Sequence, residues 1–240
     1  MEIGESREVT ELKAKVASCC QILYIEGHDD ANLGHVSARL PGESVFYMKP
    51  QGLGLEEVRA EDVLTLNWEG QVLAGPHPAH NEYPIHSEIY RARPDVNCVI
   101  HTHPFYSTVF STLAVPFQTL NHDGVLFAHG LKVFDRTPDL LVTKEQGESL
   151  AADLGDADAI LLRNHGTVVV GRSVEEACLT QLALEKAVKV LLQAIASGKE
   201  FYPMDLAMAE KMAQDVRQNQ RRTQNVFAYY QRKAQRLLGI

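Results

Sequence analysis

The stretch VNCVIHTHP, residues 96–104, contains the features that decide the architecture of this chain. Its first part, Val96–His101, is an apolar run of strongly β-prone residues, and a helix that begins with a proline is expected just after it, over 105–114. His101 and His103 stand where the strand ends. Residues i and i+2 of an extended segment point to the same side, so these two imidazoles can bind one ion.

On the N-terminal side, residues 7–27 show apolar positions at helical spacing, and Gly27 supplies a stop. Short β-prone runs separated by turn-forming residues come next, and a further helix is predicted over Tyr83–Arg93. The predicted strands are Val36–Leu40, Val45–Met48, Val63–Asn67 and Val72–Leu73.

The C-terminal half continues the alternation of strands and helices. Two apolar strands, Ala159–Arg163 and Thr167–Val170, flank the turn Asn164-His165-Gly166. A helix is predicted from the N-cap Ser173, with Glu176 completing a capping box, to about Ser197. A last helix is predicted over Leu206–Leu238. The pattern predicts an α/β fold, one domain over residues 1–240 with a mixed sheet flanked by helices.

Composition narrows the class of protein. The 240 residues carry a formal net charge of −8, with 45% hydrophobic and 22% charged residues, which is ordinary for a globular protein. The acidic balance argues against a nucleic-acid partner. No apolar run approaches the roughly 18 residues of a membrane span, and no signal peptide is expected. The four cysteines match neither a disulfide framework nor a zinc ribbon, which favours a cytoplasmic protein.

A third histidine joins the first two. His165 lies in the turn between two apolar strands, at a sheet end, where sites tend to form. Three imidazoles and an open position are typical of a catalytic zinc-type centre. Glu82 precedes the His101 strand by one predicted helix and is the candidate carboxylate for this site. His86 follows it by one helical turn and is placed to orient it.

Five segments now make a pattern that resembles the class II aldolase/adducin family. They are GHVSARL (34–40), KPQG (49–52), HNEYPIH (80–86), RPDVNCVIHTHP (93–104) and LLRNHG (161–166), and they follow the family's order and spacing. The resemblance implies a single αβα sandwich with a mixed, largely antiparallel sheet. It implies a homotetramer with active sites between subunits, His101, His103 and His165 as metal ligands, and Glu82 as the acid/base.

The predicted substrate pocket departs from the family's sugar-phosphate aldolases. Those enzymes hold phosphate with Gly-Asn, Ser-Gly and Ser-Ser pairs, and the corresponding pairs here are Gly34-His35, Gln51-Gly52 and His80-Asn81. A phosphate cradle depends on backbone N–H groups and compact hydroxyls, which larger side chains displace. His35 and His80 suit a substrate carboxylate or ring hydroxyl, and either can donate a proton. The loops also resemble the family's branch that decarboxylates hydroxy-aromatic acids.

Two further candidates depend on a neighbouring subunit. The aldolases place a tyrosine from the next subunit near the region of His122, and this histidine is the candidate replacement. Tyr229 and Tyr230 resemble the family's second intersubunit tyrosine, and Tyr230 is the candidate catalytic residue. The alternative for both tyrosines is packing at helical spacing.

The reaction expected from the resemblance is cleavage of a carbon–carbon bond, with a divalent cation stabilising the resulting enolate as a Lewis acid. The first hypothesis is a decarboxylase of a non-phosphorylated hydroxy-aromatic or keto/hydroxy acid, in which Glu82 or His35 protonates the carbon. The second is an aldolase acting on a small hydroxy-keto compound, and the third is a non-catalytic adducin-like scaffold. One ion per subunit is expected: zinc or manganese first, with cobalt or iron(II) also compatible with imidazole ligands.

Overall fold

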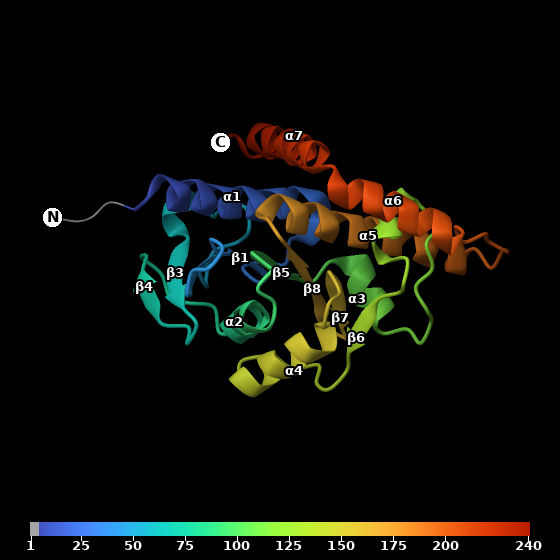
Figure 1. Ribbon diagram of the computed structural model, residues 1–240, viewed down its shortest axis with the longest axis horizontal. Coiled ribbons are helices and arrows are strands. Elements are labelled where there is room, and N and C mark those ends of the chain that lie inside the picture. Colours follow the sequence, from blue (N-terminus) through green and yellow to red (C-terminus); the bar gives the residue numbers. More distant parts are fainter. Residues whose placement is uncertain (1–4) are drawn as a thin grey trace.

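Strand β5 (Cys98–Thr102) lies inside an eight-stranded sheet of the computed structural model, which describes residues 5–240 (Figure 1). The strand order is β4-β3-β2-β1-β5-β8-β7-β6. Only the pair β6–β7 is parallel, so the predicted mixed and largely antiparallel sheet is confirmed. The other strands are β1 (His35–Ala38), β2 (Val45–Met48), β3 (Leu64–Asn67), β4 (Val72–Ala74), β6 (Lys132–Phe134), β7 (Ala159–Leu162) and β8 (Gly166–Gly171).

Helices cover both faces of this sheet, as expected for an αβα sandwich (Figure 1). One face carries α1 (Arg7–Leu23), α3 (Phe105–Ser111), α5 (Val174–Ala196), α6 (Leu206–Gln218) and α7 (Gln220–Leu238). The other carries α2 (Tyr83–Ala92) and α4 (Lys144–Leu154), and three short turns of other helix types complete the chain: η1 (Tyr24–His28), η2 (Ala60–Asp62) and η3 (His122–Phe127). Within residues 5–240, no helix has the length and apolar character needed to cross a bilayer.

Strand β7 shows why both faces need helices. Its alternate residues point to opposite sides, and all four are buried: Leu161 packs in the cluster with α5, and Ile160 and Leu162 pack in the cluster with α2 and α4. A strand buried on both faces reads as a continuous apolar run, as this one does. The four cysteines are buried free thiols.

Three local predictions need correction. The last helix is broken into α6 and α7 at Asn219, whose side chain accepts the Arg222 N–H at 3.0 Å and so competes with the helical backbone bond. The predicted capping box is half present, because Glu176 accepts the N–H of Arg172 rather than that of Ser173. Strand β6 and helix α4 were not predicted, since β6 has only three residues and its first two are exposed.

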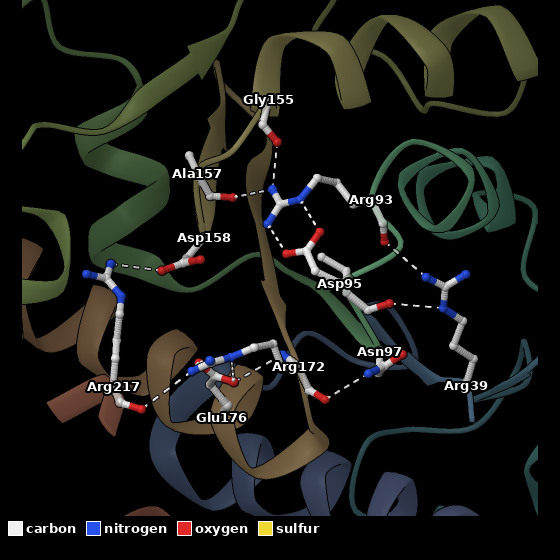
Figure 2. Close-up of polar contacts among 11 residues, drawn as sticks. Arg39, Arg93, Asp95, Asn97, Gly155, Ala157, Asp158, Arg172, Glu176 and Arg217 are labelled. Carbon is white, nitrogen blue, oxygen red and sulfur yellow. Dashed lines mark hydrogen bonds and ion pairs between the residues drawn. The ribbon is translucent and has the colours of Figure 1, made fainter. Parts of the chain in front are cut away.

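At the N-terminal end of β5, arginine side chains donate hydrogen bonds to backbone carbonyl oxygens of neighbouring segments (Figure 2). The Arg93 guanidinium donates to the carbonyl oxygens of Gly155 at 2.6 Å and Ala157 at 3.2 Å, and it pairs with both oxygens of Asp95. Arg39 donates to three further carbonyl oxygens, those of Tyr90, Val96 and Arg93. This arginine frame joins β1, the end of α2 and the loop before β7.

Candidate metal centre and active site

Three imidazoles meet at the opposite end of the same strands. His101 is in β5, His103 follows that strand, and His165 sits in the β7–β8 turn. One nitrogen from each lies within 4.8 Å of the others, and the ring centroids are 4.8–5.0 Å apart. The structure therefore brings together the three histidines that the sequence assigned to a metal.

The hydrogen bonds of the histidine triad (His101, His103 and His165) leave ring nitrogens free to bind a cation. His101 Nδ1 donates to the Thr167 carbonyl oxygen at 2.9 Å, and His103 Nδ1 lies 2.8 Å from the Asp30 carboxylate. With both Nδ1 atoms protonated, the two Nε2 atoms present lone pairs to each other at 3.0 Å. Such a pair is electrostatically unfavourable unless a positive charge lies between them, and metal-ligating histidines are held in this same way.

The turn that delivers His165 depends on its neighbours. A Cβ on Gly166 would lie 2.6 Å from both His103 Cδ2 and the Thr102 carbonyl oxygen, so only glycine allows the close approach. The left-handed residue is Asn164, with φ of 59°. Gly166 is thus needed for space against the second histidine rather than for an unusual φ.

Glu82 lies beside the triad. It is 2% exposed at the N-cap of α2, its Oε1 accepts the Leu141 N–H at 2.9 Å, and its Oε2 is 3.9 Å from His101 Nε2. Burial raises the pKa of this carboxyl, although the Leu141 N–H opposes the shift. A carboxyl of this kind is suited to carry a proton in the reaction.

His35 and His80 complete the buried group. His35 is fully buried in β1, its Nε2 lies 3.5 Å from Glu82 Oε2, and its ring stacks on His80 with centroids 4.1 Å apart. His80 Nδ1 accepts the Glu82 N–H at 3.3 Å, which leaves the proton of a neutral imidazole on Nε2. Together with Glu82 these residues form a second cluster of potential ligand atoms within 4.8 Å.

Burial favours the neutral form of four imidazoles, those of His35, His80, His101 and His165. It is the main cause that lowers the pKa of His80 and of His165 to about 4, and it lowers the pKa values of His35 and His101 well below the usual range. Neighbouring histidines act in the same direction on His35 and His101. Neutral imidazoles can bind a cation or donate one hydrogen bond.

The other predicted substrate residues lie on loops at this end of the sheet. Gln51 and Gly52 are exposed, and the Gln51 N–H donates to the Pro78 carbonyl oxygen at 3.1 Å, which ties their loop to the one carrying His80. Asn81 is exposed between His80 and Glu82. Lys49 is fully buried and donates to the Asn32 carbonyl oxygen at 3.1 Å, so it joins the loop after β2 to the loop before β1.

His122 and Tyr230 lie elsewhere. They line a cavity of about 560 Å³ between η3, α5 and α7, and neither the three metal-centre histidines nor Glu82 lines it. The Tyr230 hydroxyl accepts a hydrogen bond from Lys186 Nζ at 2.9 Å, while Tyr229 is half exposed. The structure therefore does not bring these two residues to the triad of their own chain.

Sequence reasoning missed several supporting groups. Asp30 precedes its partner His103 by 73 residues, and the Leu141 N–H comes from a loop without a sequence signal. The expectation that His86 orients Glu82 is wrong: His86 contacts His35 and Ser37, because the His35 ring takes the place beside the carboxylate.

Known proteins resemble this chain in sequence. The family model described as "Class II Aldolase and Adducin N-terminal domain" matches residues 14–192. The "Meiotically up-regulated gene 14 protein" of Schizosaccharomyces pombe is 31% identical over 188 residues, 73% of each chain. The "3,4-dihydroxyphthalate decarboxylase" of Arthrobacter keyseri is 32% identical over 200 residues, covering 76% of this chain and 78% of its own.

A solved structure agrees in fold. The "L-fuculose 1-phosphate aldolase from Glaciozyma antarctica PI12" superposes with a TM-score of 0.84 at 26% identity, over 97% of this chain and 91% of its own. This chain is therefore similar to a decarboxylase in sequence and to an aldolase in structure, and both of those proteins are lyases.

Proposed function

Because this chain belongs to the class II aldolase and adducin family, we propose that it is a divalent-metal-dependent carbon–carbon lyase. Its substrate would be a non-phosphorylated hydroxy-aromatic or keto/hydroxy carboxylic acid, which it would decarboxylate. The observation that carries this proposal is the buried group of Glu82, His35 and His80 directly beside the histidine triad.

His101, His103 and His165 would hold one ion per subunit, with Zn²⁺ or Mn²⁺ preferred and Co²⁺ or Fe²⁺ compatible. A divalent ion bound there would supply Lewis acidity for the negative charge that develops on a substrate oxygen. The chain's own contribution is to orient the imidazoles, which Thr167 does for His101 and Asp30 does for His103.

The pocket composition supports a carboxylate rather than a phosphate. His80, with Nδ1 accepting the Glu82 N–H, can donate a hydrogen bond from Nε2 to a carboxylate oxygen, and the fully buried His35 stands where the sequence pattern of the aldolases has asparagine. Gln51 and Gly52 from one loop, and Asn81 from another, would contact the rest of the substrate at the rim. Neutral donors of this kind orient a carboxylate without stabilising it too strongly to leave.

Residues of this chain would then supply the one proton that the decarboxylation requires. Loss of carbon dioxide breaks the carbon–carbon bond and leaves the electron pair on carbon, conjugated to the neighbouring oxygen. Glu82, with its raised pKa, or His35 would donate the proton that forms the new C–H bond. Burial of both groups excludes water from the carbanion.

The second candidate is an aldolase, favoured by the structural likeness to a fuculose-phosphate aldolase. Glu82 would then accept the proton of a hydroxyl as the aldehyde leaves. An adducin-like scaffold is the least supported reading, because the triad and Glu82 are all present and buried together.

We further propose a homotetramer with active sites between subunits, in a cytoplasmic protein whose four thiols stay free. Helix α3, which follows His103, presents Phe105 at 68% exposure with Val109, and Leu113 and Val115 continue this apolar surface. A neighbouring subunit on this surface could bring its own His122 and Tyr230 to the triad.

The test is a product screen with the purified, metal-analysed full chain. Hydroxyphthalates, hydroxypyridine dicarboxylates and ketose phosphates are offered in turn. Carbon dioxide released from an aromatic acid supports the first proposal, and aldehyde released from a ketose phosphate supports the second. Full turnover by a protein freed of metal would overturn both.

A further inference from the structure

Helix α2 and strand β1 form a line of alternating polar side chains inside the molecule. Glu82, His86 and Tyr90 recur every four residues at the start of and along α2, and so share one face of the helix. His35 and Ser37 recur every two residues in β1 and share one face of the strand. All five side chains are buried, with exposures from 0 to 2%.

The two rows interlock as a chain of short contacts. The Tyr90 hydroxyl lies 2.7 Å from Ser37 Oγ, which lies 2.6 Å from His86 Nδ1. His86 Nε2 lies 2.6 Å from His35 Nδ1, and His35 Nε2 faces Glu82 Oε2 at 3.5 Å. This series of contacts therefore runs from Tyr90, in the second half of α2, to the Glu82 carboxyl at the N-cap of the same helix.

The available donors and acceptors fix which atom donates in each of these hydrogen bonds. Within residues 5–240, Ser37 Oγ is the acceptor that the buried Tyr90 hydroxyl reaches. The Ser37 proton must then go to His86 Nδ1, so His86 carries its own proton on Nε2 and donates it to His35 Nδ1. The reverse direction would leave the buried Tyr90 proton without an acceptor, which is costly.

We infer that His86 and Ser37 are positioning residues that hold His35 as the neutral tautomer with its proton on Nε2, directed at Glu82 and the substrate. The role of that proton in a reaction rests on the proposed function. Its location on Nε2 rests only on the hydrogen bonds described above. Neither His86 nor Ser37 touches the substrate, and both act through His35.

Two further observations agree with it. His35 Nε2 is buried and has no hydrogen-bond partner within the described chain, so its N–H is available to donate a hydrogen bond to a substrate atom. The Arg39 guanidinium packs on the Tyr90 ring, 4.7 Å from the centroid, and donates to the Tyr90 carbonyl oxygen at 3.1 Å. The arginine frame therefore fixes the far end of the chain.

The experiment locates the His35 proton directly. Histidine-¹⁵N-labelled full-length protein, metal-free and Zn²⁺-loaded, is studied by long-range ¹H–¹⁵N correlation, with His35→Gln used to assign the signal. We expect the proton on Nε2 in the wild type. In Ser37→Ala the His86 Nδ1 loses its donor, so both His35 tautomers should appear and kcat should fall at least about tenfold with little change in KM.

Two matched variants separate positioning from packing. Tyr90→Phe removes a hydroxyl from the same chain but leaves His86 as the acceptor for Ser37, so the His35 proton should stay on Nε2 and kcat should fall less than in Ser37→Ala. His86→Gln keeps a donor and an acceptor in place and should retain the tautomer, whereas His86→Leu should lose it. Thermal melting and metal content confirm that each variant is folded.

A wild-type proton on His35 Nδ1, or an unchanged tautomer in Ser37→Ala, would overturn the inference. Equal losses of kcat in Ser37→Ala and Tyr90→Phe, tracking their melting temperatures, would also overturn it in favour of packing alone. If the tautomer shifts as expected but no aromatic acid is decarboxylated, the inference stands and the proposed reaction fails.

Discussion

The two ends of strands β1, β5 and β8 are built from the same backbone but treat polar groups in opposite ways. At one end, Arg39 and Arg93 place their guanidinium donors on carbonyl and carboxylate oxygens (Figure 2). At the other end, imidazoles crowd together with lone pairs facing each other, and within residues 5–240 Nε2 of His35 and Nδ1 of His165 are buried without a hydrogen-bond partner. Satisfied polar groups stabilise a fold, whereas the unpaired ring nitrogens at the histidine end remain available to a ligand.

The largest expected effect comes from removing a ligand. In His101→Ala, bound metal and turnover should both be lost, with kcat/KM falling at least about 10³-fold, because the Lewis acid carries the developing charge. Metal analysis and product release are measured on the same sample, with Arg93→Ala as the comparison variant that keeps its metal. An active, metal-free His101→Ala would contradict the account.

Acid should lower the free energy of unfolding through the buried histidines. Six histidines have folded pKa values below the ordinary 6.5, chiefly through burial: His28, His35, His80, His86, His101 and His165. The unfolded chain therefore binds more protons below pH 6.5, and stability falls as pH falls. Each such histidine costs about 1.4 kcal/mol per pH unit well below 6.5. Urea unfolding of the metal-free protein between pH 7 and pH 4 measures the slope. A flat profile would show that these imidazoles are not buried as neutral groups.

Glu82→Gln should keep the fold and lose the proton. The amide still accepts the Leu141 N–H and fits the same space, so melting should change little while kcat falls about 10²–10⁴-fold. In the wild type, a protonated Glu82 acting as the acid gives a kcat that falls as pH rises through its raised pKa. A wild-type rate that instead rises over this range would assign Glu82 the role of base.

Arg93→Ala should act on stability instead of chemistry. It leaves the carbonyl oxygens of Gly155 and Ala157 and the Asp95 carboxylate without their donor, at a cost of about 2–3 kcal/mol in the free energy of unfolding. Activity per folded molecule should stay close to wild type. A loss of metal affinity in Arg93→Ala would mean that the two ends are coupled.

The smallest effect is expected for Asp30→Asn. His103 would keep a polar neighbour but lose the carboxylate that holds its Nδ1 proton, so metal affinity should fall about 10–100-fold. Competition with a chelator of known affinity measures the change. An unchanged affinity would limit Asp30 to a surface contact, in keeping with its partial exposure.

The same contrast explains what sequence could predict. The strand alternation, the His101–His103 spacing and the His165 turn are local patterns, and the structure confirms that they converge. The contacts that complete the site join distant segments: Ser37 and His86 are 49 residues apart, and Asp30 and His103 are 73 residues apart. No local period records such contacts, and the arginine frame was missed for the same reason.

Helix α2 shows this limit on a small scale. Its N-terminal boundary and the polar face with Glu82 and His86 follow from helical spacing. Spacing alone assigned His86 to Glu82, but the β1 strand inserts the His35 ring between them. Helical period predicts which face a residue occupies, and the facing strand decides what it touches.

Anomalous diffraction from crystals of the metal-loaded full-length protein tests the central claim most directly, since two clusters of ligand atoms lie side by side. The account predicts one anomalous peak per subunit, bonded to His101, His103 and His165. A peak bonded to His35 and His80 instead would contradict it, because it would need a lone pair on the His35 nitrogen that is inferred to carry the proton.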